Sequence, residues 1–150
     1  MARDRGGARS RQRARELLIK ALYQWQLAGH TAAEITAQFE TVEGFDRCDR
    51  EYFDALLTTV IDNVAALDAI IAEQAARGLE QLDAVGHAIL LLALAELKFR
   101  GDVPTKVVIN EAVELAKRYG AAESYKFVNA LLDRTARELQ RGPSGAEAKA

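Results

Sequence analysis

Residues 83–99 read DAVGHAILLLALAELKF and form the most apolar stretch of the chain. The eight residues Ala88–Ala95 carry no polar side chain, so a helix here would be hydrophobic on every side. Such a helix belongs in the interior of a protein, and this run is far shorter than the ~20 apolar residues that cross a bilayer. We therefore expect a central, buried helix that begins at Asp83 and ends before Gly101–Pro104, where proline breaks the pattern.

The rest of the chain also shows apolar residues at spacings of three and four, which is typical of amphipathic helices. A chain of 150 residues fits one domain, since domains cluster at roughly 100–150 residues. We predict an all-α fold of about seven helices, with a flexible basic tail at residues 1–8, one domain at 9–140 and a second tail at 141–150. The first predicted helix runs from about Ser10 to Gly29, and the second from a capping box at Thr31–Glu34 to near Gly44. The third runs from Asp46 or Asp49 to a break at Asp62–Asn63, and the fourth from there to before Gly78. The fifth runs from Asp83 to Gly101, the sixth has Pro104 in its first turn and ends at Gly120, and the seventh begins at about Ala122.

Composition narrows the class of protein. The chain is 49% hydrophobic and 28% charged, which is ordinary for a globular domain. Its single cysteine, Cys48, rules out an intramolecular disulfide and a multi-cysteine zinc site, and it fits a reducing cytosol. His30 and His87 lie too far apart for a local metal motif. We expect a cytoplasmic protein with no membrane segment, no metal and no cofactor.

The net charge of −2 conceals an uneven distribution. Residues 1–20 hold seven basic and two acidic side chains, a local charge of +5. The other 130 residues hold 13 basic and 20 acidic side chains, a charge of −7. Such an asymmetry suggests that one end of the chain contacts nucleic acid.

No arrangement of residues predicts catalysis. The sequence has no glycine-rich phosphate loop, no zinc-protease motif and no nucleophile elbow. Glu111 and Glu114 come nearest to an acid–base pair, but we favour a polar helix face with a buried Asn110 beside it. Cys48 has no nearby histidine and lies among acids, which raise rather than lower the pKa of a thiol. We expect a protein that is not an enzyme.

The basic end carries arginines at every second position from 9 to 15. If this segment is helical, Arg11 and Arg15 lie four residues apart on one face. Guanidinium groups bind phosphate oxygens in a bidentate way, and binding that neutralises phosphates weakens with salt. A solvated tail that only aids solubility explains the same residues, so the basic end alone leaves both interpretations open.

Aromatic residues accompany the basic ones. Tyr23 lies eight residues beyond Arg15, near the same helix face, and residues 123–127 read ESYKF at a predicted helix start. Single-stranded RNA is read by stacking bases on aromatic rings, and the free amides of a helix start bind phosphate. From the residues alone we slightly favour a half-buried ring at Tyr23 and core packing at Phe127 over RNA stacking.

Three segments resemble the signatures of the NusB family of bacterial transcription antitermination factors. They are RQRARE at 11–16 with ALYQWQ at 21–26, DVPTKVVINEAVELAK at 102–117, and KFVNALLD at 126–133. Their order and spacing agree with the family from about Arg11 to Arg137. The resemblance implies an all-α fold of two small bundles packed crosswise, and no catalysis.

The resemblance also implies partners. Family members bind the boxA element of nascent ribosomal RNA together with NusE, a small-subunit ribosomal protein, and the pair helps RNA polymerase read through terminators. Self-association, known among relatives, stays open. By position, RNA binding is expected at Arg11, Arg13, Arg15, Lys20, Tyr23, Glu123, Lys126 and Phe127, and contact with NusE at Tyr23, Glu80 and Gly86.

The chain departs from the family pattern at two positions. Gln12 stands where some relatives have a third consecutive arginine, so one phosphate contact is expected to be missing. Gly86 stands where relatives often carry glutamate, so the chain lacks one polar contact with NusE at this position. Glu80 is a remaining acid that could contact NusE. The acid at Glu123, usually aspartate in the family, is expected to tune RNA affinity.

Two other functions stay open: an accessory to a separate RNA methyltransferase, and a helical adapter or dimer that binds no RNA.

Overall fold

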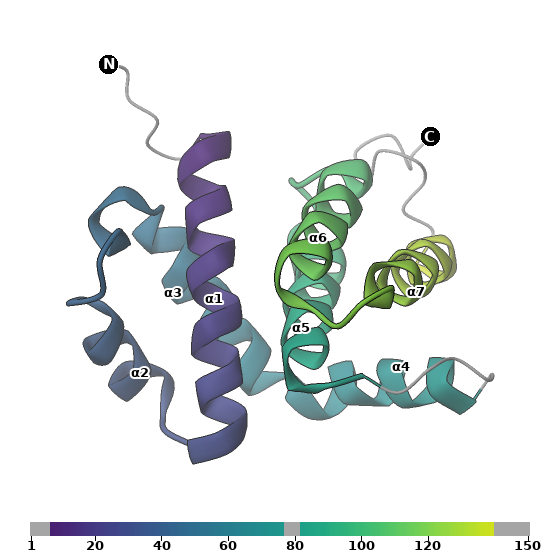
Figure 1. The fold of residues 1–150 in the computed structure, drawn as a ribbon, viewed down its shortest axis with the longest axis horizontal. Coiled ribbons are helices and arrows are strands. Elements are labelled where there is room, and N and C mark those ends of the chain that lie inside the picture. The colour runs from purple at the N-terminus through teal and green to yellow at the C-terminus, as the bar shows by residue number, and fades with distance from the viewer. Residues whose placement is uncertain (1–6, 77–81, 140–150) are drawn as a thin grey trace. The chain divides into compact units, whose positions relative to one another are not determined.

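The computed structural model describes residues 7–76 and 82–139 (Figure 1). These residues form seven α-helices and one short 3-10 helix, with no strand among them, so the predicted all-α fold is confirmed. The helices are α1 (Ala8–Ala28), α2 (Ala32–Phe39), η1 (Phe45–Arg47), α3 (Arg50–Asp62), α4 (Val64–Ala76), α5 (Ala84–Phe99), α6 (Thr105–Tyr119) and α7 (Ser124–Glu138).

The chain divides into two compact units, Met1–Asp62 and Asn63–Ala150. In the N-terminal unit, α3 packs on both α1 and α2. Its core centres on Phe53, whose ring centroid lies 5.8 Å from that of Phe39 and 5.3 Å, edge to face, from that of Phe45. Rings at these separations attract one another in addition to burying apolar area. The protein's one tryptophan, Trp25, lies on α1 in this unit.

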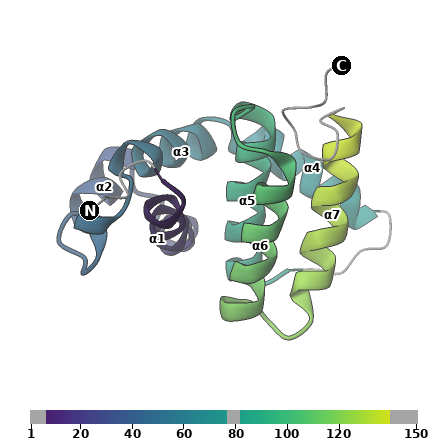
Figure 2. The ribbon, with the colours of Figure 1, turned by 90° about the horizontal axis from the view of Figure 1, so that it is seen from above.

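In the C-terminal unit, α5 contacts α4, α6 and α7, and α6 packs most extensively on α7 (Figure 2). Every residue of α5 from Ala88 to Leu97 is buried. The prediction of a central helix that is buried all round is therefore confirmed within this unit. The acidic Glu96 is buried with them.

Local sequence explains where the helices begin. At α2, Thr31 Oγ1 accepts from the Glu34 amide at 3.1 Å and Glu34 Oε1 accepts from the Thr31 amide at 2.9 Å, so the predicted capping box is present. The hydrogen bond from that amide lowers the pKa of Glu34. At α5, the Asp83 carboxylate accepts from the Gly86 amide at 2.8 Å. The predicted break falls at residue 63, between α3 and α4.

Several predicted boundaries were wrong. Helix α1 starts at Ala8 rather than Ser10, because the Gly7 carbonyl already accepts from the Arg11 amide at 3.0 Å. Helix α2 ends at Phe39 rather than near Gly44, since residues 40–44 form turns that lead into η1. Pro104 is the N-cap of α6 rather than part of its first turn, because its backbone is extended. Gly78 and the expected tail at 141–150 lie outside the described residues, as does the expected tail at 1–8 except for its last two residues.

Among the described residues, no single helix is both long and apolar enough to cross a membrane. Only the bent pair of α3 and the first part of α4, counted together, reaches that length and composition.

Candidate nucleic-acid interface

The basic end of α1 is held by the start of α3. The Asp49 amide donates to the Ser10 carbonyl at 3.0 Å, which ties the two segments together. The Asp49 carboxylate accepts from the Tyr52 amide at 3.1 Å and so caps α3. Its other oxygen lies 3.7 Å from Nε of Arg11. Asp49 therefore serves as a helix cap and as the counter-charge of an arginine at the same time.

Tyr52 lies beneath two arginines of α1. The guanidinium carbon of Arg11 lies 4.3 Å from the centre of the Tyr52 ring, and that of Arg15 lies 5.5 Å from it. Nη2 of Arg15 also lies 3.5 Å from the Tyr52 hydroxyl oxygen, at the limit for a hydrogen bond. Both distances to the ring are within the reach of a cation–π interaction. The ring thus holds both guanidinium groups in place.

Burial separates these two arginines. Arg15 is only 3% exposed, so its guanidinium is occupied inside the unit rather than presented to solvent. Arg11 keeps about a quarter of its side chain exposed beside Asp49. In this conformation Arg11 can meet a phosphate, whereas Arg15 is placed to orient Tyr52.

Three other predicted residues lie along an accessible side of α1. Arg13, Lys20 and Tyr23 follow at spacings of seven and three, so Lys20 lies two turns beyond Arg13 and Tyr23 one turn further, along one helix face. Lys20 is exposed, and 40% of Tyr23 is accessible to solvent. The ring of Tyr23 is therefore available for stacking rather than committed to the core.

Arg13 is steadied by its neighbours. Its Nη1 lies 3.6 Å from a carboxylate oxygen of Glu16, one turn along the helix. A Cβ built on Gly44 would lie 3.4 Å from the same nitrogen, so the Arg13 side chain lies against the turn before η1. Gly44 has φ of 92°, a left-handed conformation that favours glycine. About two fifths of the Arg13 side chain remains exposed.

The second group of predicted residues lies at the start of α7. Glu123 precedes the helix with φ of 69°, and it is the only described non-glycine residue with a positive φ. Its carboxylate lies 2.5 Å from Nζ of Lys126, and both side chains are about two thirds exposed. The hydrogen bond that Lys126 donates to the Glu123 carboxylate, aided by the charge of that carboxylate, raises the pKa of Lys126. The lysine is thus accessible but partly neutralised by its own neighbour.

The amides at this helix start are less available than the sequence suggested. The Ser124 amide donates to the Ala121 carbonyl at 3.0 Å, and the Lys126 amide donates to the Glu123 carbonyl at 3.1 Å. Phe127 is only 7% exposed, so the structure favours core packing over base stacking for most of its ring. Tyr125 is half-buried, with Nζ of Lys117 5.0 Å from the ring centre.

The sequence did not single out Tyr52 or Asp49 for this surface. Tyr52 falls within the third predicted helix, and it lies 37 positions from Arg15. No local spacing links residues so far apart. The predicted residues of α1 belong to the N-terminal unit and those of α7 to the C-terminal unit.

Of the residues expected to contact a protein partner, Glu80 lies outside the described residues. Gly86 is buried in the first turn of α5. A Cβ there would lie 3.0 Å from Cδ2 of Leu82 and 3.2 Å from Oδ1 of Asp83. Any larger residue at position 86 therefore requires the Leu82 and Asp83 side chains to shift by a few tenths of an ångström.

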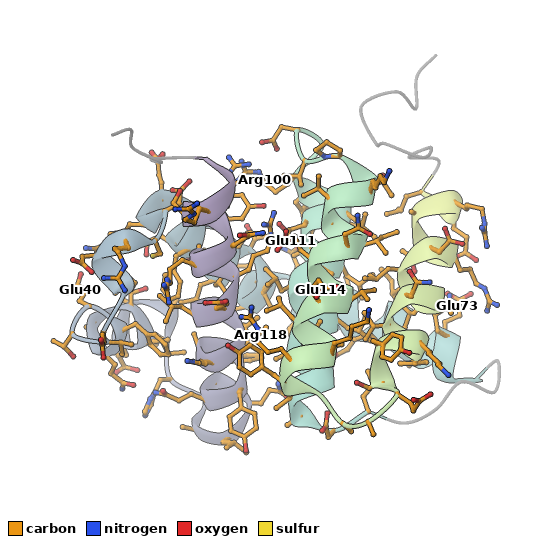
Figure 3. The ribbon with its side chains drawn as sticks, turned by 45° about the horizontal axis from the view of Figure 1, so that its top comes forward. Glu40, Glu73, Arg100, Glu111, Glu114 and Arg118 are labelled. Atoms are coloured by element: carbon orange, nitrogen blue, oxygen red, sulfur yellow. The ribbon has the colours of Figure 1, made fainter. Side chains whose placement is uncertain are left out.

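The described residues offer little for catalysis or metal binding. No group of three or more histidine, cysteine or acidic side chains among them could hold a metal ion. Burial, with the charges of Asp49 and Asp54, raises the pKa of Cys48 to about 11, so the thiol stays protonated at neutral pH. Glu111 and Glu114 both project from α6 (Figure 3). The expectation of a buried Asn110 beside them was wrong, because the first turns of α6 expose this side chain.

Comparison with known proteins places this architecture in a family. The model of the NusB family matches residues 12–137. Transcription antitermination protein NusB of Paraburkholderia xenovorans (strain LB400) is 47% identical over 140 residues, which cover 93% of this chain and 97% of the relative. The protein of the same name from Paraburkholderia phytofirmans is 49% identical over 131 residues, covering 87% and 91%.

Two solved structures of NusB proteins also match this chain. T. maritima NusB superposes with a TM-score of 0.73 at 35% identity, covering 85% of this chain and 91% of that one. The solution structure of NusB from Aquifex aeolicus gives a TM-score of 0.67 at 28% identity, covering 88% and 92%. The family consists of transcription antitermination factors and not of enzymes. With its helices, its basic α1 and nearly its whole length matched, the chain belongs to the NusB family.

Proposed function

We propose that this antitermination factor binds the boxA element of nascent ribosomal RNA together with NusE, and that the pair supports read-through by RNA polymerase in the cytoplasm. Membership of the NusB family assigns transcription antitermination to the chain, with RNA and the transcription machinery as its partners. The choice of boxA and NusE rests on the motifs of residues 11–26, 102–117 and 126–133.

The observation that carries the RNA-binding proposal is the accessible row on α1. Arg13 and Lys20 present cations on the same helix face as the exposed ring of Tyr23. A cation that neutralises a phosphate, next to an aromatic ring that stacks on a base, is the usual means of binding single-stranded RNA. This row occurs on a chain whose net charge is −2, so the attraction is local to the surface.

The structure changes the role proposed for individual residues. Arg11, Arg13, Lys20 and Lys126 are assigned to phosphates. Arg15 is assigned to positioning, since it is buried against Tyr52. Phe127 offers at most a ring edge to RNA.

Glu123 is assigned to limiting affinity, because its carboxylate both repels phosphate and pairs with Lys126. Tyr23, in addition to stacking on RNA, is assigned with Glu80 and Gly86 to NusE. At Gly86 the missing carboxylate weakens that contact, so we expect Gly86→Glu to tighten NusE binding if Leu82 gives way.

The proposal is tested by titrating a short boxA RNA and a scrambled RNA of equal length, with and without NusE, over a series of salt concentrations. We expect preference for boxA, tightening by NusE, and an affinity that falls as salt rises. Loss of preference for boxA or of tightening by NusE would contradict the proposal.

Other outcomes identify other functions. Absence of any salt-dependent binding to RNA would favour a helical adapter or dimer. Co-purification with an RNA methyltransferase, in place of NusE-dependent binding, would favour the accessory role. Light scattering in the same buffers shows whether RNA binding changes the oligomeric state.

A further inference from the structure

A groove of about 490 Å³ lies between α6 and α7, and of the side chains discussed above its lining includes Asn110. Its walls include Lys106, Ile109 and Asn110 from the N-terminal half of α6, and Asn129, Asp133 and Arg137, which run from the middle of α7 to its end. Figure 2 shows these two helices side by side. The volume falls within the roughly 300–1,000 Å³ typical of ligand sites.

The groove carries a specific chemistry. Asn110 and Asn129 each offer a carboxamide, which both donates and accepts hydrogen bonds. The side chains of Asp133 and Arg137 pair with each other at 2.6 Å, which leaves the charge of Lys106 as the uncompensated one among the lining residues. Amides beside a net positive charge are complementary to a nucleotide, whose base edges hydrogen-bond and whose phosphate is anionic.

The groove is continuous with the proposed RNA surface on α7. Asn129 follows Lys126 by three residues, so the two exposed side chains lie on adjacent turns of the same helix side. One turn of α-helix rises about 5.4 Å. A strand held at Lys126 therefore reaches the groove within a single helical turn.

We propose that this groove binds nucleotides flanking the boxA segment, with Asn110 and Asn129 contacting base edges and Lys106 contacting a phosphate. The inference rests on the proposed function and extends its RNA site. A helical peptide fits the groove less well, because such peptides bind through several large apolar anchors. Although most of the accessible lining surface is apolar, Ile109 is the one large apolar side chain in it.

The test compares the minimal boxA RNA with RNAs extended by a few natural nucleotides on the 5′ side or the 3′ side. We expect one extension to tighten binding about three- to tenfold, the size of one or two net hydrogen bonds. Asn110→Ala and Asn129→Ala remove the carboxamide without adding a charge near Lys126. Each should abolish the gain from the extension and leave binding of the minimal RNA within twofold.

Lys106→Ala should reduce the same gain, and Lys98→Ala is its matched control, since Lys98 is an exposed lysine on α5 outside the groove. Circular dichroism verifies that each variant retains its helices.

If neither extension tightens binding while the minimal RNA binds normally, the inference is overturned and the proposed function stands. If the minimal RNA does not bind at all, both fail. If the groove variants lose only the tightening by NusE, the groove is a protein contact and the inference is also overturned.

Discussion

The two sets of predicted RNA-binding residues are built in opposite ways. At the start of α1, arginines are packed on Tyr52 and paired with Asp49, so their positions are set before any ligand arrives. At the start of α7, Lys126 is 64% exposed, and its paired carboxylate lies three residues away on the same helix. The first region is packed and partly buried, whereas the second is solvated and paired with a neighbouring charge.

This difference shows that a basic or aromatic side chain in a matching motif can serve the fold, the ligand or both. Burial decides among these roles, because a group must reach solvent to contact RNA directly. Arg15 and Phe127 are buried, while Arg13 is partly exposed and Lys126 is exposed. Four substitutions, given from the largest expected effect to the smallest, test whether the distinction is real.

Phe127→Ala should have the largest effect, and on stability. Removing a buried aromatic ring costs about 3–5 kcal/mol of unfolding free energy through lost burial and a residual cavity. Chemical denaturation measures it directly. Phe127→Leu is the control, since it fills much of the same space, and we expect it to stay within about 1.5 kcal/mol of the native protein. If Phe127→Ala is as stable as the native chain but loses RNA affinity, the ring belongs to the RNA surface after all.

Arg15→Ala should also act mainly through stability. It removes the group that covers the Tyr52 ring and meets its hydroxyl, and an unpaired buried polar group costs about 1–3 kcal/mol. Tyr52→Phe deletes only the hydroxyl and is the matched comparison. Equal stability of Arg15→Ala and the native protein, together with a reduced dependence of RNA binding on salt, would return Arg15 to the phosphate-binding group.

Arg13→Ala should leave stability within about 0.5 kcal/mol, as for most surface substitutions. Its effect belongs to RNA binding: losing one phosphate contact to a single strand reduces the slope of log affinity against log salt by about 0.7. Titrations at four or more salt concentrations give that slope. An unchanged slope would show that Arg13 only covers the turn at Gly44.

Glu123→Gln should have the smallest effect of the four, and it should raise RNA affinity rather than lower it. Loss of the carboxylate removes repulsion of phosphate and frees Lys126, so we expect RNA affinity to rise about two- to fivefold, since exposed ion pairs are weak. Glu123→Gly additionally relieves the left-handed backbone and separates strain from charge. A fall in affinity for the glutamine variant would mean that the carboxylate contacts a base.

The same pair predicts a pH dependence. Glu123 raises the pKa of Lys126 above its ordinary value of 10.5, so the pair's contribution to stability is present at lower pH and is lost as pH rises through the raised value. In Glu123→Gln the pKa of Lys126 should return toward 10.5. Nuclear magnetic resonance of the lysine side chain measures both values, and equal values would show that the pair does not persist in solution.

The helices could be predicted because their signals are local. The apolar run at 88–95, the capping box at Thr31 and the cap at Asp83 lie within a few residues of the structures that they specify. The end of α2 was placed too late, because nothing in residues 40–44 shows that the chain turns before its glycine.

The site could be predicted less completely, because exposure depends on contacts that are distant in sequence. The burial of Arg15 depends on Tyr52 in another helix. The apolar series that begins at Phe127 has the same spacing whether its first ring faces the core or the solvent. The groove between α6 and α7 arises only once two helices pack, so no motif indicates it.

The division of the chain into two units makes the cooperativity of folding measurable. Trp25 is the protein's one tryptophan, and it lies in the N-terminal unit. Its fluorescence follows the unfolding of that unit, whereas far-ultraviolet circular dichroism sums the helices of both. Coincident melting curves would indicate a single cooperative transition, and separate curves would show that one unit can melt while the other persists. A ligand that contacts both units would then draw the two curves together, so this one indole offers a reporter of RNA binding that needs no label.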